Sequence, residues 1–195
     1  MNKYLKTTLV LLILIGMPAF AWYFLERGTS LRKAAMKSLE PKEAIGQFET
    51  PTEKDIIINS EKLKGKRWLI AVIGSLDRRT DYCKILTNLY QQSKESFKPY
   101  IMTVIGLKHG EPLKATSETL KLPSEDNHWN ICYLSIDHVF PFCTEAFNLR
   151  EAYQDKDCII LLDENLMVRN YYLLSDTKEI QKLIREYPVF LSLKN

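Results

Sequence analysis

The stretch RWLIAVIGSLDRRTDYCKIL, residues 67–86, decides the fold class of this chain. It opens with an apolar run that ends at Gly74, which is typical of a strand buried on both faces of a sheet. A polar loop follows, and over residues 81–96 apolar side chains recur at helical spacing, with Thr80 or Asp81 as a suitable N-cap. A buried strand that leads directly into an amphipathic helix predicts an α/β domain.

The same alternation continues towards the C-terminus. Residues 51–66 form a lead-in that contains a short strand within IIINS. The pattern then predicts strands over residues 99–106, 130–137, 157–163 and 167–174, and helices near 115–122 and over 141–152 and 176–187. We therefore expect residues 51–195 to form one domain, a sheet with helices on both faces.

The N-terminus has the properties of a membrane segment. Residues 7–25 contain no charged residue, and such a run is about long enough to cross a bilayer as a helix. A cleaved signal peptide is the alternative, because Ala19 and Ala21 form an A-x-A pattern. The apolar run continues past Ala21 to Leu25, which an anchor requires and a cleavage site does not. We predict a transmembrane signal anchor over residues 1–25 and a polar stalk over residues 26–50.

Charge composition bears on the partners of the domain. The chain has 27 Lys and Arg against 24 Asp and Glu, a net charge of +3. Without Lys3 and Lys6 the remainder carries 25 − 24 = +1, so no basic face for nucleic acid is expected. Positive charges flank the apolar run on both sides and do not settle its orientation. Because a signal-like N-terminus usually exports the domain behind it, we expect a periplasmic or exoplasmic domain on a single-pass anchor.

Two stretches resemble the thioredoxin superfamily. Residues 157–187, DCIILLDENLMVRNYYLLSDTKEIQKLIREY, are similar to the end of such domains: an apolar strand ending in Asp, a turn, a strand opening with Val-Arg, and a helix. Residues 134–149, LSIDHVFPFCTEAFNL, resemble the preceding segment in peroxiredoxins and in the copper-related SCO proteins. The resemblance covers roughly residues 50–190. It implies a thioredoxin-like mixed sheet with flanking helices, and chemistry in the loop at residues 74–86.

That loop departs from each pattern of the superfamily. Compared with the C-x-x-C of disulfide oxidoreductases, Cys83 matches the second cysteine and Thr80 replaces the first. Compared with the C-x-x-x-C of SCO-like proteins, Arg79 replaces the first cysteine, and the region matching their histidine, residues 152–158, contains no His. A thiol without a partner cannot cycle between dithiol and disulfide. The peroxiredoxin pattern retains Thr80 and Cys83, but Leu76 replaces its proline.

Cys83 therefore has two interpretations. It is a small apolar residue on the buried face of a helix, or a single nucleophile assisted by Thr80, with Cys158 as the resolving thiol. The resemblance places the start of the strand at Cys158 opposite the loop, so a Cys83–Cys158 disulfide is the functional candidate. The alternative is that all four cysteines are reduced and buried.

A metal site has little support in the sequence. Soft-metal ligands occur at His128, Cys132, His138 and Cys143, but their spacing matches no standard zinc or copper pattern. We therefore predict no cofactor and no metal.

Two functional classes remain. The favoured hypothesis is a membrane-anchored thioredoxin-like domain that serves, without catalysis, as an accessory or assembly subunit of an integral-membrane complex, such as a respiratory complex. The alternative is a thiol-dependent oxidoreductase resembling peroxiredoxins, with Cys83 as its single reactive cysteine.

Overall fold

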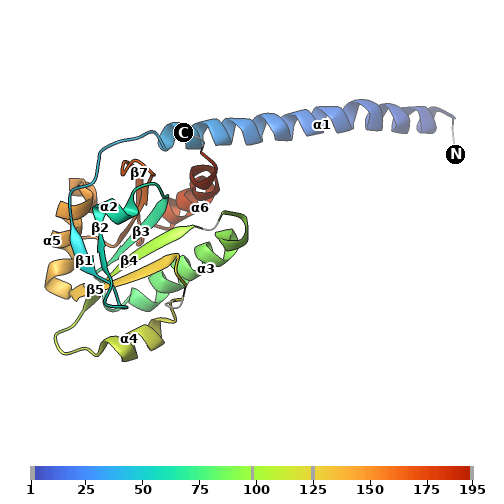
Figure 1. Ribbon diagram of the computed structural model, residues 1–195. Coiled ribbons are helices and arrows are strands. Elements are labelled where there is room, and N and C mark those ends of the chain that lie inside the picture. The colour runs from blue at the N-terminus through green and yellow to red at the C-terminus, as the bar shows by residue number, and fades with distance from the viewer. Residues whose placement is uncertain (1–2, 98, 124–125, 194–195) are drawn as a thin grey trace. The chain divides into compact units, whose positions relative to one another are not determined.

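The computed structural model describes residues 3–97, 99–123 and 126–193 (Figure 1). It contains two compact units, Met1–Ser38 and Leu39–Asn195.

The first unit is one long helix, α1 (Lys3–Ser38). The helix is long and apolar enough to cross a membrane, and its candidate span, Leu11–Ser38, buries no side chain of its most apolar window within the protein. At 36 residues α1 has a length of about 54 Å, more than the hydrocarbon core requires. The helix thus continues beyond the apolar run, through the basic residues that follow it.

The second unit is built on a five-stranded sheet with the order β5-β4-β3-β6-β7. Strands β3, β4 and β5 are parallel, whereas β6 and β7 are antiparallel to their neighbours. The predicted mixed sheet with flanking helices is confirmed. The elements of this unit are β1 (Glu49–Pro51), β2 (Ile57–Asn59), α2 (Ser60–Leu63), β3 (Trp68–Ile73), α3 (Arg79–Phe97), β4 (Tyr100–Leu107), α4 (Leu113–Leu120), β5 (Trp129–Ser135), α5 (Ile136–Phe147), η1 (Glu151–Tyr153), β6 (Cys158–Leu162), β7 (Val168–Leu173) and α6 (Thr177–Ser192).

The sheet is covered on both faces, which explains the uninterrupted apolar strands. Helices α3, α4 and α6 pack on one face, and α5 packs on the other together with α2 and β2 (Figure 1). All six residues of β3 are buried, because successive side chains point into opposite layers and both layers are apolar.

Residues 39–50 belong to the compact unit, which corrects the expected stalk. Leu39 is almost completely buried, and the backbone that follows it is bonded to β7 and α5. These bonds join Lys42 N to Val168 O (2.9 Å), Val168 N to Glu43 O (2.8 Å), Ile45 N to Leu166 O (3.1 Å) and Gly46 N to Ala146 O (2.8 Å). The polar composition of the segment hid this role, because backbone groups make the attachment.

Candidate functional site

The loop between β3 and α3 is held by a carboxylate from a distant part of the chain. Asp157, directly before β6, is buried, and its Oδ1 accepts hydrogen bonds from Gly74 N (2.6 Å) and Ser75 N (3.0 Å). Bonds from backbone N–H groups to an ionised acceptor are stronger than those between neutral groups. Asp157 therefore fixes the point where the chain leaves the sheet.

Gly74 also has a packing role in this loop. The ring of Phe140 on α5 lies against it so closely that a Cβ at Gly74 would be only 2.4 Å from the ring. Gly106, near the end of β4, packs against Gly74: a Cβ added at Gly106 would lie 3.4 Å from the Cα of Gly74. The two glycines let β3, β4 and α5 meet closely at this edge of the sheet.

Cys83 is on the face of α3 that packs against the sheet. Its side chain is fully buried, and burial raises the pKa of the thiol to about 12, although the nearby Arg79 guanidinium acts in the opposite direction. Thr80, one turn earlier, is exposed to solvent. The two residues of the expected T-x-x-C pair therefore lie in different environments, and the thiol is protonated near neutral pH.

Cys83 and Cys158 lie on opposite faces of the sheet, so the expectation that they are near neighbours is wrong. Cys158 is in register with Val72 and shares the α5 layer with it, whereas Cys83 packs in the α3 layer. The neighbouring residue, Ile159, faces α3 instead. Side chains alternate between the two faces along a strand. Cys158 is one residue away from a position that faces α3, so the sheet lies between its thiol and that of Cys83. Each of the four cysteines is free and buried.

The other three cysteines share the α5 layer. Burial raises the pKa of the Cys132 thiol to about 12 and also raises the pKa values of Cys143 and Cys158. Cys143 is close enough to the other two to interact with them electrostatically. His138 is exposed, and His128 is bound to Asp126. Within residues 3–97, 99–123 and 126–193, no three His, Cys, Asp or Glu side chains gather as metal ligands.

Arg79 begins α3 and forms the dominant ion pair of this edge. Its two terminal nitrogens contact the carboxylate of Glu111 at 2.6 and 3.2 Å, and one of them also donates to Gly106 O. The carboxylate additionally accepts from Lys108 N and the Thr116 hydroxyl. Chiefly because of Arg79, the pKa of Glu111 falls to about 2. The position that resembles the first cysteine of C-x-x-x-C therefore holds a bidentate cation.

Sequence reasoning located this loop but missed both of its acidic partners. Glu111 lies in a polar stretch without periodicity, and Asp157 lies 83 residues from Gly74. No local pattern marks either residue. Asp157 had one signal, an acid directly before a buried strand.

Structural comparison defines the fold. No protein-family model and no curated protein matches the sequence. Among solved structures the chain is similar to BsSco, a member of the Sco family of cytochrome c oxidase assembly proteins, with 17% identity and a TM-score of 0.58 over 80% of this chain and 98% of that one. It is also similar to a SCO1/SenC family lipoprotein from Bacillus anthracis, with 15% identity and a TM-score of 0.55 over 76% and 96% of the two chains.

A third similar structure is a putative thiol:disulfide interchange protein DsbE from Chlorobium tepidum. It has 11% identity and a TM-score of 0.56 over 79% of this chain and 99% of that one. The fold of this chain is thioredoxin-like. In this thioredoxin-like domain, the Arg79–Glu111 pair lies at the start of α3, next to the loop that follows β3, and Cys83 on the first turns of that helix is in the core.

Proposed function

We propose that this chain is a membrane-anchored thioredoxin-like protein that acts without thiol chemistry, as an accessory or assembly subunit of an integral-membrane complex. Helix α1 supplies the anchor, and the thioredoxin-like domain supplies the contact surface. The similarity to BsSco, an assembly protein of cytochrome c oxidase, supports a respiratory complex as the partner. The similarity to a lipoprotein supports an exoplasmic domain.

The burial of Cys83 carries this proposal. With a pKa of about 12, on the order of one thiol in 10⁵ is ionised at pH 7. A nucleophilic cysteine requires the thiolate and access to its substrate, and the Cys83 side chain has neither. Arg79, which could have activated a thiol, is instead engaged by Glu111.

The test is purification of the tagged full-length protein in mild detergent, followed by mass spectrometry of whatever elutes with it. We expect a stoichiometric membrane complex with the natural chain and with Cys83→Ala or Cys83→Ser. Deletion of residues 1–25 should abolish the complex. Replacing the same residues by an unrelated membrane helix keeps the protein at the membrane and is the matched control for the deletion. Purification of the chain alone, or loss of the complex in a folded Cys83→Ala variant, would contradict the proposal.

A further inference from the structure

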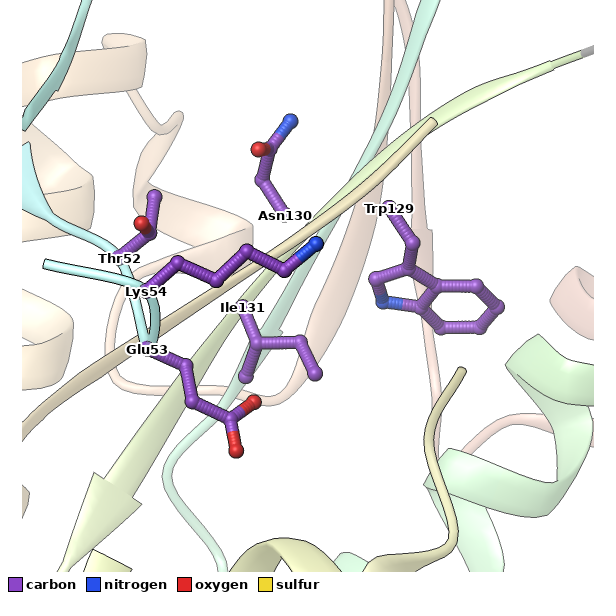
Figure 2. A pocket seen from close by; sticks show the side chains of 6 residues that line it. All are labelled: Thr52, Glu53, Lys54, Trp129, Asn130 and Ile131. Carbon is purple, nitrogen blue, oxygen red and sulfur yellow. The ribbon is translucent and has the colours of Figure 1, made fainter. Parts of the chain in front are cut away.

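A groove lies at the other end of the strands from the loop between β3 and α3. It has a volume of about 240 Å³ and is lined by β2 on one side and by the starts of β3, β4 and β5 on the other. Figure 2 shows the adjoining wall, where the hairpin turn at Thr52–Lys54 lies beside Trp129–Ile131 of β5. Glu53 N donates to Ile131 O at 2.7 Å, which fastens the turn to this sheet edge.

A row of three aromatic rings in tilted contact runs along the groove, and two of them, Trp68 and Tyr100, line it. The ring of Tyr100 lies 5.1 Å from that of Trp68 and 4.7 Å from that of His128, measured between centroids. The Lys66 ammonium lies 4.5 Å from the Tyr100 centroid, in a cation–π contact. These contacts between the rings restrict the side chains to defined positions, which favours a surface formed before any ligand arrives.

Two lysines give the groove a positive charge that the chain does not neutralise. Lys62 Nζ donates one hydrogen bond to Ile57 O, which leaves two of its three donors for other acceptors. In the part of the chain that the structure describes, no ion pair includes Lys62 or Lys66. Asn127 and Asn130 add amide groups to the lining. The groove therefore complements a ligand that carries a carboxylate and backbone-like polar groups.

The rim of the groove is apolar. Ile56 and Ile57 are 55% and 49% exposed, whereas Ile58 is buried in the core. Ile58 accounts for the packing of β2, so the other two isoleucines make no comparable contribution to the core. Adjacent exposed apolar side chains beside a charged groove are typical of a contact surface for another chain.

We propose that this groove binds an extended peptide segment of a partner protein, in which an acidic side chain is next to an apolar one. The carboxylate pairs with Lys62 and Lys66, and the apolar side chain covers Ile56 and Ile57. The cavity is smaller than the roughly 300–1,000 Å³ of pockets for whole small molecules, which favours one or two side chains over a cofactor. The inference rests on the proposed accessory function and names the chemistry of the partner.

The experiment is a selection of random displayed heptapeptides on the full-length protein in lipid nanodiscs. We expect the bound peptides to be enriched in Asp or Glu beside Leu, Ile or Phe. In fluorescence anisotropy at low salt, the Kd of the best peptide should rise about tenfold in the Lys62→Gln/Lys66→Gln variant. In about 0.5 M salt the difference between the two proteins should be smaller, because ion pairs at an exposed rim are screened by salt. Lys64→Gln, an exposed lysine of the same segment outside the lining, is the matched control and should bind as the natural chain does.

Three outcomes would overturn the groove assignment. The selected peptides show no acidic enrichment, or they bind the double variant as tightly as the natural chain. In the third, the natural chain binds phosphatidylglycerol vesicles and no peptide, and the double variant loses this vesicle binding. Co-purification with the double variant separates this inference from the proposed function. If a complex is retained while no acidic peptide is selected, the accessory role stands and the groove assignment fails. If acidic peptides bind and the natural chain purifies alone, the groove assignment stands and the accessory role fails.

Discussion

At the scale of a single residue, the burial of Cys83 determines whether its thiol can act as a nucleophile. Its position early in α3 resembles that of a catalytic cysteine, but a reactive thiol needs the thiolate form and access. The helix turns Cys83 into the layer between α3 and the sheet, where ionisation is strongly disfavoured. The same helical geometry that suits a nucleophile at a helix start thus makes an inert core residue when the side chain points inward.

We expect Cys83 to resist alkylation in the native protein. At pH 8 its reaction with iodoacetamide should be about a thousandfold slower than that of an exposed cysteine, because thiolate populations differ by about that factor. Mass spectrometry of the peptide that contains Cys83 measures the rate.

The matched control places a thiol on the exposed side of the same turn. Thr80→Cys in a Cys83→Ala background should react at the rate of a free thiol, because Thr80 is exposed. Rapid modification of native Cys83 would instead support the thiol-redox alternative.

At the scale of elements, the Arg79–Glu111 pair connects the start of α3 to the segment before α4. Glu111 has a pKa of about 2 in the folded protein, below its ordinary value of 4.5. A carboxyl whose folded pKa is lowered stabilises the fold above its unfolded pKa, and this contribution is lost as pH falls from about 4.5 towards 2. The side chain is partly exposed, so the loss should be about 1 kcal/mol rather than the full shift.

Urea unfolding of the full-length protein between pH 5 and pH 3 tests this pair. Glu111→Gln should be less stable than the natural chain at pH 5, and the difference should shrink as pH falls. Glu118→Gln, at an exposed acid of α4, is the control and should follow the natural pH dependence. If Glu111→Gln keeps the natural pH dependence of stability, the Arg79–Glu111 ion pair is not the cause of that dependence.

Most elements could be predicted because their signals are local. The apolar runs of β3, β4, β6 and β7 and the periodicity of α3 lie within the segments themselves. The predicted helix over residues 141–152 had the wrong start, because α5 begins at Ile136 and contains Pro141. Strand β1 was missed because three residues with one buried side chain carry no periodicity.

The partners in the candidate site could not be predicted, because they depend on tertiary placement. Which face Cys158 occupies depends on a register of one residue between β3 and β6. The bonds from Gly74 and Ser75 to Asp157 cross more than eighty positions of sequence. The order of strands and helices can be predicted from the sequence, whereas the tertiary partners of a given side chain are known only from the structure.

At the scale of the whole chain, the boundary between α1 and the thioredoxin-like domain has a measurable consequence. Residues 39–50 look like a polar stalk in sequence, yet they add backbone bonds to β7 and α5 and bury Leu39. A domain comprising residues 39–195 should unfold cooperatively in urea. A domain that begins at residue 52 also lacks β1, and it should lose about 4 kcal/mol or more of unfolding free energy, from several backbone hydrogen bonds near 1 kcal/mol each and one buried leucine.

A single substitution tests the same boundary without shortening the chain. A methyl group at Gly46 would lie 2.7 Å from the carbonyl oxygen of Glu145, a backbone atom that cannot move aside without displacing α5. Gly46→Ala in residues 39–195 should therefore reproduce much of the destabilisation caused by starting at residue 52. If both changes leave the unfolding free energy unaltered, residues 39–51, β1 included, contribute nothing to the stability of the domain.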